Sequence, residues 1–217
     1  MQLNKLLLEY IVREPAVSQA KPPLLVLLHG VGGNETNLFK YATMFPLEYV
    51  VVAPRAPFIK TVGSYAWFSV NFAMGKPIIN PEEAEQSRGI LTEFINQLIE
   101  KYNVDSTNIY LVGFSQGAIM CYSVALTKPG CIKGIAALSG RILPEIKPLV
   151  TPSETLPKLK VLISHGEEDN KLPVQYARDA KEYIESLHIP LAYIEWPATG
   201  HLVNNDIMQK VVEWMVR

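Results

Sequence analysis

The most informative segment of the chain reads Ile109-Tyr110-Leu111-Val112-Gly113-Phe114-Ser115-Gln116-Gly117. Its first four residues predict a buried strand, and the apolar residues after it predict a helix over residues 116–127. Ser115 has a glycine two positions away on each side, so we expect a sharp strand-to-helix turn whose neighbours have no room for side chains. Such a turn strains the serine backbone and raises its hydroxyl above the sheet, beside a helix N-terminus. We interpret Ser115 as a nucleophile rather than an incidental residue of a glycine turn.

The rest of the chain alternates short apolar runs with segments of helical period. The predicted strands are residues 6–12, 24–28, 49–53, 109–112, 135–138, 160–164 and 191–196. The predicted helices are residues 35–44, 81–102, 116–127, 173–187 and 205–215. Most strands are apolar on both faces, which predicts an α/β fold with a mainly parallel, twisted sheet of about seven strands and helices on both faces. In such a sheet, functional groups gather at the carboxyl ends of the strands.

Two loop signals refine this prediction. Asn80 can cap the helix over residues 81–102, Pro81 suits its first turn, and Glu83 can reach back as a capping-box partner. Four prolines between residues 140 and 160 predict an extended surface excursion that is too short to form a separate cap domain. We therefore expect residues 1–217 to form one domain.

Composition excludes several classes of protein. Hydrophobic residues make up 48% of the 217 residues and charged residues 19%, which argues against disorder. A formal net charge of −1 gives no footprint for nucleic acid or anionic membrane. We expect no membrane span, because every apolar run is far shorter than about 18 residues. We expect no secretory leader, because Glu9 interrupts the short apolar run Leu6-Leu7-Leu8. Cys121 and Cys131 cannot build a disulfide framework, so we expect a soluble, cytoplasmic protein; a homodimer is left open.

A serine hydroxyl becomes a strong nucleophile only when a base takes its proton and a carboxylate orients that base. His201 lies in the loop between the last predicted strand and the last predicted helix, where the base belongs in a chain ordered serine, acid, histidine. The other histidines have structural interpretations. His29 and His165 follow strands and can bond loop backbone, while His188 ends a helix.

The orienting carboxylate is expected in the loop after the penultimate strand, which reads His165-Gly166-Glu167-Glu168-Asp169-Asn170. We select Asp169 and interpret Glu167 and Glu168 as solvated loop charges. A metal site built from these histidines and Asp169 has no support from HExxH or similar spacing, and no cofactor is implied.

Acyl transfer also needs preorganised donors for the oxygen that becomes negative. One is expected from the backbone N–H of Gln116, and the other from Val31 in the loop His29-Gly30-Val31-Gly32-Gly33. The alternative that these glycines cradle a phosphate is unconvincing, because neither the P-loop lysine pattern nor Gly-x-Gly-x-x-Gly is present.

These motifs together resemble the phospholipase/carboxylesterase family of α/β-hydrolases, which includes acyl-protein thioesterases and small bacterial carboxylesterases. The family's order is matched from about residue 24 to the C-terminus by Leu28-His29-Gly30-Val31-Gly32-Gly33, Pro54-Arg55-Ala56-Pro57, Trp67-Phe68, Gly113-Phe114-Ser115-Gln116-Gly117, Leu138-Ser139-Gly140, His165-Gly166 with Asp169, and Gly200-His201. The resemblance implies an α/β-hydrolase fold without a large cap domain, a triad of Ser115, Asp169 and His201, and an oxyanion hole of Val31 and Gln116.

Two departures bear on the branch of the family. Many relatives carry an Asp after the Trp-Phe pair, where this chain has Ser69, and thioesterase-like members often carry Gly-Asp where it has Gly32-Gly33. These differences favour a bacterial-type carboxylesterase. For the substrate-binding walls we select Trp67 and Phe68, whose alternative is packing under a loop.

The opposite wall is assigned to Ile142 and Leu143. Arg55 and Arg141 follow strand ends. We interpret both as loop anchors, and attraction of an anionic substrate is the alternative. The expected function is that of a serine carboxylesterase that hydrolyses small to medium acyl esters through an acyl-enzyme on Ser115. The alternatives are an acyl-protein thioesterase or lysophospholipase-type hydrolase, and a non-catalytic receptor for small molecules on the same fold.

Overall fold

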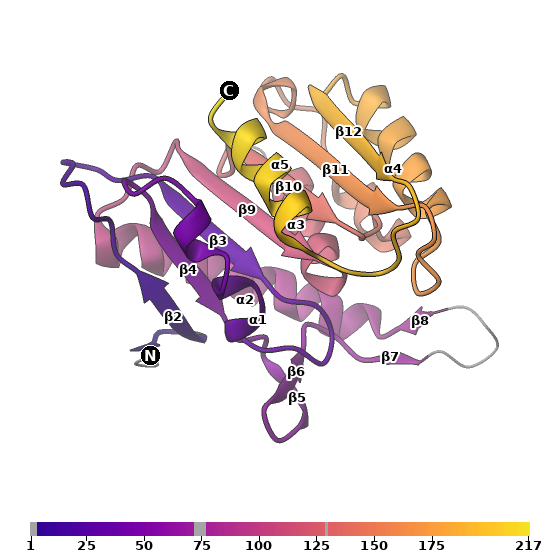
Figure 1. Ribbon diagram of the computed structural model, residues 1–217, viewed down its shortest axis with the longest axis horizontal. Coiled ribbons are helices and arrows are strands. Elements are labelled where there is room, and N and C mark those ends of the chain that lie inside the picture. The colour runs from indigo at the N-terminus through magenta and orange to yellow at the C-terminus, as the bar shows by residue number, and fades with distance from the viewer. Residues whose placement is uncertain (1–3, 72–76, 129) are drawn as a thin grey trace.

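A twisted eight-stranded sheet forms the centre of the molecule in the computed structural model, which describes residues 4–71, 77–128 and 130–217 (Figure 1). Across the sheet the strands are β1 (Asn4–Lys5), β2 (Glu9–Arg13), β4 (Val50–Pro54), β3 (Leu24–Leu28), β9 (Ile109–Phe114), β10 (Gly134–Leu138), β11 (Lys160–Gly166) and β12 (Leu191–Trp196). The pairs β1–β2 and β2–β4 are antiparallel and the other neighbours are parallel. The predicted mainly parallel sheet is confirmed, with β1 as an additional edge strand.

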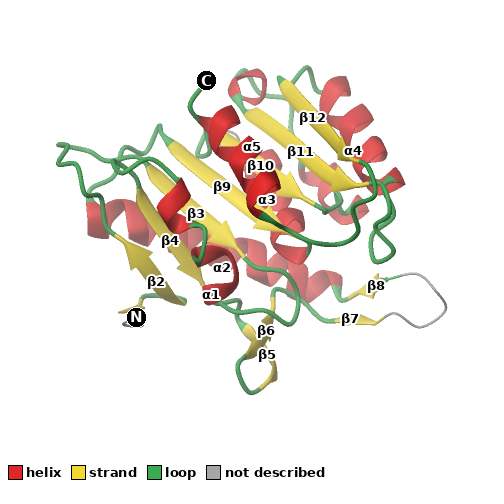
Figure 2. Ribbon diagram, viewed as in Figure 1, coloured by secondary structure: helices red, strands yellow, loops and turns green. Residues whose placement is uncertain are grey.

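Helices cover both faces of this sheet, as predicted (Figure 2). One face carries α2 (Pro81–Tyr102), α3 (Gln116–Thr127) and α4 (Gln175–Ser186), and the other carries α1 (Thr36–Phe39) and α5 (Asn205–Met215). Side chains alternate between the two layers along each central strand. In β3, Leu24, Val26 and Leu28 pack toward α2 and α3, whereas Leu25 and Leu27 pack toward α1 and α5. This double burial explains why β3 is apolar at every position.

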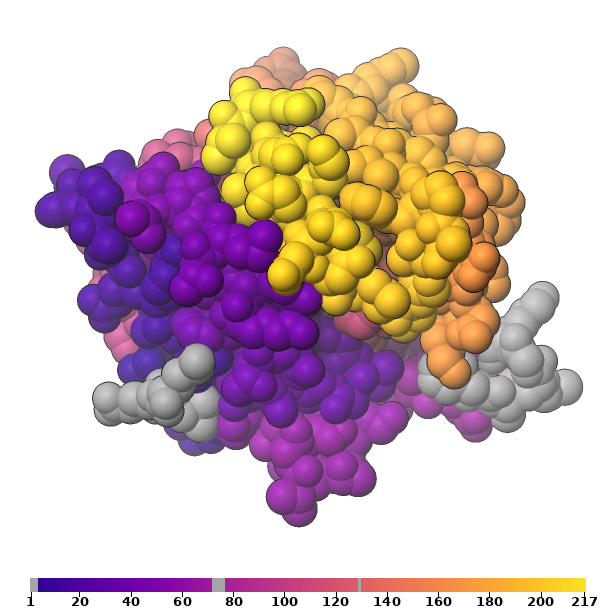
Figure 3. All heavy atoms as spheres, viewed as in Figure 1, coloured from indigo at the N-terminus to yellow at the C-terminus, as the bar shows by residue number. Residues whose placement is uncertain are grey.

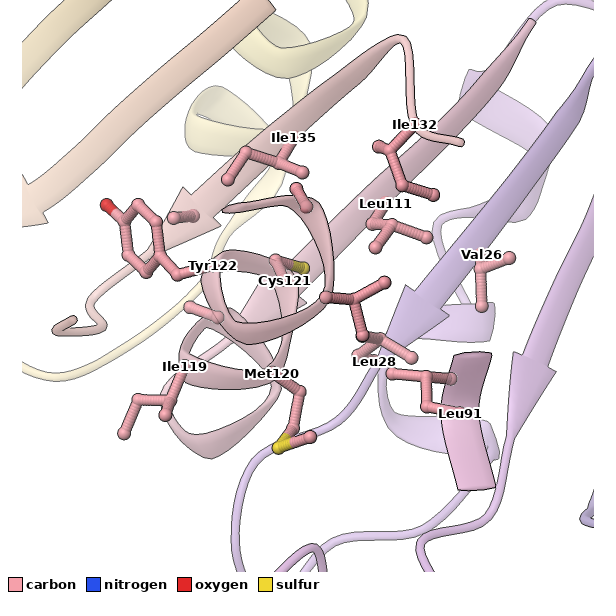
Figure 4. Close-up of a cluster of buried hydrophobic side chains, with 14 of the residues drawn as sticks. Val26, Leu28, Leu91, Leu111, Ile119, Met120, Cys121, Tyr122, Ile132 and Ile135 are labelled. Atoms are coloured by element: carbon pink, nitrogen blue, oxygen red, sulfur yellow. The ribbon is translucent and has the colours of Figure 1, made fainter. Parts of the chain in front are cut away.

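Helix α3 is the most deeply buried helix, because all its residues from Gln116 to Leu126 are buried. Figure 4 shows Met120 and Cys121 of α3 among side chains of the sheet and of α2, with Leu28 and Leu91 nearby. Full burial of one such aliphatic side chain contributes roughly 1.5–3 kcal/mol. The helix that begins directly after Ser115 is therefore held firmly against the sheet.

The predicted helix over residues 35–44 is wrong as one continuous element. It is replaced by the short α1 and a 3₁₀ turn over Ala42–Met44. Pro46 disfavours helical backbone at Phe45, which is extended with ψ 153°. The Arg13 guanidinium donates to carbonyl oxygens of Ala42, Phe45, Pro46 and Tyr49 at 2.6–3.1 Å. These bonds tie the segment over residues 42–49 to Arg13 of β2.

The start of α2 confirms one capping prediction and corrects another. The Asn80 side chain accepts hydrogen bonds from the N–H groups of Glu82 and Glu83 at 3.1 and 3.2 Å. Glu83 forms no capping box, because the Asn80 N–H donates to the carbonyl oxygen of Ser69 at 3.0 Å. The Glu83 carboxylate instead accepts from the Ser69 N–H at 2.5 Å. Both bonds tie the segment after Phe68 to the start of α2.

Two hairpins project from the sheet between β4 and α2 (Figure 1). They are β5 (Phe58–Thr61) with β6 (Ser64–Ala66), and β7 (Val70–Asn71) with β8 (Ile78–Ile79). The apolar residues 72–74, which the sequence assigns to this loop, lie outside the described residues. The excursion over residues 140–160 holds 3₁₀ turns at Pro144–Leu149 and Leu156–Lys158, so it adds no cap domain.

The carboxyl ends of β3, β9, β11 and β12 lie at one edge of the sheet, where the sequence places its functional loops. Figure 3 shows the last helix and the segment before it, in yellow, on the surface between the first third of the chain and the orange segments. Within the described residues, no helix combines the length and apolar character needed to cross a bilayer.

Candidate active site

Ser115 occupies a strained turn between β9 and α3, with φ 54° and ψ −116°. Such backbone costs of order 1–3 kcal/mol and persists only where its surroundings enforce it. A Cβ at Gly113 would lie 2.3 Å from the carbonyl oxygen of Gly117, and one at Gly117 would lie 2.0 Å from that of Leu28. The glycines are therefore required by backbone contacts, as the sequence predicts.

His201 connects Ser115 to Asp169, although the three residues lie on different loops. Its Nε2 is 2.9 Å from the Ser115 Oγ and its Nδ1 is 2.6 Å from the Asp169 Oδ2. An ionised carboxylate can only accept, so Nδ1–H donates to Asp169 and Nε2 is left to accept from the serine hydroxyl. The Phe114 ring packs against the imidazole, with centroids 4.8 Å apart. The structure thus brings together the three side chains that the sequence selects.

Asp169 is held by donors on both oxygens. Its Oδ1 accepts from the N–H groups of Lys171 and Leu172, both at 2.8 Å. Its Oδ2 faces His201 and also lies 3.3 Å from the Nε2 of His165. Burial alone would raise the pKa of Asp169, but the bonds from His165 and His201 outweigh it and hold the pKa well below its ordinary value. The carboxylate therefore stays ionised beside His201.

His165 makes a contact that the sequence interpretation missed. As expected, it bonds loop backbone, since its Nε2–H donates to the carbonyl oxygen of Leu172 at 2.7 Å. The same N–H lies close to Asp169, which fixes the ring tautomer and leaves Nδ1 buried without a hydrogen-bond partner among the described residues. The spacing of four residues between His165 and Asp169 is the available sequence signal for this contact.

Hydrogen bonds to Tyr65 of β6 fix the loop that carries Val31. Gly32, with φ 78°, donates to the carbonyl oxygen of Tyr65 at 2.8 Å, and Tyr65 donates back to Gly33 at 2.9 Å. His29 supports the loop from behind, because its Nδ1–H donates to the Gly30 carbonyl at 2.7 Å. Within the described residues, the N–H groups of Val31 and Gln116 donate to no other group, so both remain available.

Burial keeps His29 neutral. Desolvation lowers its pKa from the ordinary value of 6.5 to about 4. Its Nε2 accepts from the Ala56 N–H at 3.1 Å, which is the role of an unprotonated nitrogen. His29 is therefore a structural support, as the sequence suggests.

The Gln116 side chain connects the nucleophile turn to the Trp67-Phe68 segment. Its Oε1 accepts from the Trp67 N–H at 2.8 Å and its Nε2–H donates to the Phe68 carbonyl at 2.6 Å. The Trp67 indole donates to the carbonyl oxygen of His29 at 2.9 Å. These bonds give a physical reason for the joint presence of a Gln after the serine and a Trp-Phe pair.

A cavity of about 510 Å³ opens beside Ser115 and His201. Its apolar lining is formed by side chains from several elements. They are Val31, Phe68, Val70, Pro77, Ile79, Phe114, Ile119 and Leu172. In the part of the chain that the structure describes, its charged lining consists of Arg141 and Lys171. Within the described residues, no three His, Cys, Asp or Glu side chains are grouped in a way that could hold a metal ion.

The predicted substrate-binding residues separate in the structure. Phe68 lines the cavity, whereas Trp67 is 0% exposed behind it. Ile142 and Leu143 are buried in the core on the α2–α4 side and lie outside the cavity lining. The loop after β10 turns these two side chains toward α3, which sequence spacing cannot show. We leave Trp67, Ile142 and Leu143 out of the substrate-contacting set.

The two arginines also differ. Arg55 donates to the carboxylates of Glu35 at 2.8 Å and of Glu9, and its guanidinium lies over the Tyr65 ring. Arg55 is thus a loop anchor, as expected. Arg141 lines the cavity instead.

Comparison with known proteins decides the family. The family model described as Phospholipase/Carboxylesterase matches residues 11–216, which is nearly the whole chain. The chain belongs to the phospholipase/carboxylesterase family. The resemblance inferred from the motifs is confirmed.

Relatives across this family align along their full length. The chain is 26% identical to acyl-protein thioesterase 1 of Kluyveromyces lactis, over 94% of this chain and 95% of that protein. It is 28% identical to esterase YpfH of Escherichia coli K12, over 92% of this chain and 84% of that protein. The crystal structure of esterase PE8 superposes with a TM-score of 0.79 at 27% identity, covering 100% and 99% of the two chains. The predicted α/β-hydrolase fold is confirmed.

Proposed function

We propose that this family member is a serine carboxylesterase that hydrolyses small to medium acyl esters through an acyl-enzyme on Ser115. The observation that carries the proposal is the unbroken hydrogen-bonded chain from Asp169 through His201 to Ser115, at 2.6 and 2.9 Å. A carboxylate, an imidazole and a hydroxyl in this arrangement perform nucleophilic acyl transfer on several unrelated folds. The esterase and thioesterase names of the relatives support the same chemistry.

In the first half-reaction, His201 accepts the proton of the Ser115 hydroxyl as its oxygen attacks the ester carbonyl carbon. The imidazolium that forms is stabilised by ionised Asp169, which also keeps the ring in the required tautomer. The negative oxygen of the tetrahedral intermediate accepts from the N–H groups of Val31 and Gln116. Collapse of the intermediate expels the alcohol, which takes the proton from His201, and leaves the acyl group on Ser115.

In the second half-reaction, His201 removes a proton from water, and the hydroxide attacks the acyl-enzyme carbonyl. The same backbone donors stabilise the second intermediate. Its collapse releases the carboxylic acid and returns the proton to Ser115. Each half-reaction uses the same three side chains, so no additional catalytic group is required.

The size of the cavity supports small to medium substrates. A volume of about 510 Å³ lies in the range of about 300–1,000 Å³ that is typical of small-molecule sites. Long-chain hydrolysis of the acyl-protein thioesterase or lysophospholipase type uses the same machinery and is the second candidate, favoured by the thioesterase names among the relatives. Hydrolysis of p-nitrophenyl esters from C2 to C16 separates the two, and highest kcat/KM at C12 or longer would favour the second candidate.

The decisive test is Ser115→Ala, assayed with p-nitrophenyl butyrate. We expect kcat to fall by at least about 10⁴-fold, because the nucleophile is removed. The matched control is Ser87→Ala. The Ser87 hydroxyl donates to the Trp67 carbonyl behind the cavity, and we expect this variant to fold and to keep kcat within a few-fold of wild type. Near-wild-type turnover in Ser115→Ala would end the proposal, and a wild-type protein that no fluorophosphonate labels would favour a non-catalytic receptor.

The setting of this activity forms part of the proposal. We place the enzyme in the cytoplasm, where the free thiols of buried Cys121 and exposed Cys131 would stay reduced. Its substrates are small-molecule esters, and undiminished activity in EDTA is expected for a mechanism that uses only side chains. Light scattering on the purified protein would show whether a homodimer forms.

A further inference from the structure

Among the described residues, the two charged side chains that line the cavity are cations. Arg141 follows the turn after β10, and Lys171 lies in the loop after β11. The Asp169 carboxylate does not line the cavity, since its side chain is fully buried and its oxygens are occupied by donors. The cavity therefore presents positive charge above the apolar surface that surrounds Ser115.

We propose that this cavity selects esters that carry a second, negatively charged group, with Arg141 as the carboxylate-binding residue and Lys171 as a supporting charge. The inference rests on the proposed hydrolysis at Ser115 and names the class of substrate: half-esters of dicarboxylic acids or esters of hydroxy acids.

Arg141 is positioned close to the nucleophile. A Cβ at the preceding Gly140 would lie 2.5 Å from the Cβ of Ala118 and 3.4 Å from the carbonyl oxygen of Ser115. The loop that carries Arg141 is therefore packed against the nucleophile turn. The guanidinium carbon lies 5.2 Å from the centre of the Tyr176 ring, which holds one face of the group by a cation–π contact.

Among the residues that the structure describes, the N–H groups of Arg141 have no hydrogen-bond partner. Most other arginines donate to oxygen atoms, namely Arg13, Arg55, Arg88 and Arg178. Within the described residues, Arg141 forms no hydrogen bond or ion pair, and its recorded contact is the Tyr176 ring. A guanidinium carries five N–H donors in a planar arrangement that matches a carboxylate at two points. Its unpaired donors are thus available to a ligand.

Lys171 adds a second positive charge on the same side. Its backbone N–H donates to the Asp169 Oδ1 at 2.8 Å, so the residue is fixed next to the triad. Its ammonium has no ion-pair partner among the described residues, in contrast to Lys210, which pairs with Glu213 at 2.9 Å. Two unpaired cations attract an anion and disfavour a neutral ligand that would displace their water.

The test compares substrates of matched shape that differ in charge. For a charge on the acyl side, monomethyl adipate is compared with the methyl ester of adipamic acid, in which a neutral amide replaces the carboxylate. For a charge on the alcohol side, 4-acetoxybutanoate is compared with 4-acetoxybutanamide. The measured quantity is the ratio of kcat/KM for the anionic and the neutral ester. We expect this ratio to exceed about tenfold for one of the two pairs.

Variants assign the ratio to its residues. Arg141→Gln should lower the ratio about tenfold and leave hydrolysis of the neutral ester within a few-fold of wild type. Arg141→Lys should retain part of the preference, because the charge remains but the two-point contact is lost. Lys171→Gln should lower the ratio about threefold. Lys158→Gln, at an exposed lysine in the 3₁₀ turn of residues 156–158, is the control and should leave it unchanged.

A measurement on the wild-type enzyme needs no variant. Free glutarate should inhibit hydrolysis of a neutral ester competitively, and glutaramide should inhibit at least about tenfold more weakly. A ratio near one for both substrate pairs, or an unchanged ratio in Arg141→Gln, would overturn the inference. In that case normal turnover of neutral esters would leave the proposed function intact, whereas turnover that survives Ser115→Ala would remove the proposed function itself.

Discussion

The floor and the first wall of the site are built in different ways. We define the floor as the turn over residues 113–117 with the loop over residues 29–33. We define the first wall as the segment over residues 58–71 and 77–79, which carries the cavity-lining residues Phe68, Val70, Pro77 and Ile79. In the floor, a Cβ at Gly117 would lie 2.0 Å from a backbone oxygen. In the first wall, a Cβ at Gly63 would meet nothing within 4 Å, and Val62 beside it is fully exposed.

This difference separates chemistry from selectivity. The proposed reacting groups rest on close backbone contacts, whereas the first wall is attached to the floor by hydrogen bonds. These include the bonds of the Gln116 side chain with the backbone at residues 67 and 68, and the bonds of Tyr65 with the loop over residues 29–33. The shape of the first wall can therefore change while the nucleophile stays in place.

The same substitution should have the largest effect in the floor. Gly117→Ala places a methyl group against the backbone of β3, which cannot move without breaking the sheet, so we expect a loss of about 3 kcal/mol or more in the free energy of unfolding. Gly63→Ala meets only backbone strain at φ 73°, which costs about 1 kcal/mol. Urea unfolding of both variants measures the difference. Similar losses would show that floor and first wall do not differ in packing.

A smaller effect is expected from the support behind the carboxylate. His165→Leu removes the N–H that bonds Leu172 and faces Asp169, and we expect kcat for p-nitrophenyl butyrate to fall about ten- to a hundredfold with little change in KM. His165→Gln can place an amide N–H near the position of Nε2 and should restore much of kcat. Equal losses in the two variants, or losses explained by unfolding, would reduce His165 to a packing residue.

The last expected effect is a pH dependence of stability that comes from His29. Burial holds its folded pKa at about 4, below the ordinary 6.5, so the unfolded chain binds more protons between these values. Stability should therefore fall as pH decreases from about 6.5 to 4, by at most about 1.4 kcal/mol per pH unit from this group. His29→Asn keeps a donor for Gly30 but cannot titrate, and should flatten the slope of the urea midpoint in that window. An unchanged slope would assign the dependence to other groups.

Local signals predicted the sheet, and they selected three side chains that the structure brings together, because each signal rests on short-range constraints. Helices α2, α3 and α5 have the predicted bounds. Asn80 caps α2, the strand-to-helix turn starts α3, and a polar loop precedes α5. The close contact of Gly117 with β3 leaves one arrangement for the turn that carries Ser115. His201 and Asp169 follow from strand order, because the ends of parallel strands meet at one edge of the sheet.

The failed predictions involve side chains whose direction depends on distant contacts. Ile142 and Leu143 follow a strand end just as Arg141 does, yet they turn into the core while Arg141 lines the cavity. Glu83 has the spacing of a capping box, but the Asn80 N–H donates to the Ser69 carbonyl oxygen instead, and Glu83 accepts from the Ser69 N–H. The contact of His165 with Asp169 depends on the path of the loop between them, which spacing does not define.

The bonds from the Gln116 side chain have a consequence for engineering. A chimera that grafts the segment after β4 from another hydrolase onto this scaffold would bring a foreign main chain to positions 67 and 68. Unless the donor protein carries a glutamine directly after its own nucleophile, the grafted main chain would not be shaped to pair with the Gln116 side chain that the scaffold retains. Exchange of substrate preference by loop transplantation should therefore move residue 116 and the transplanted segment together.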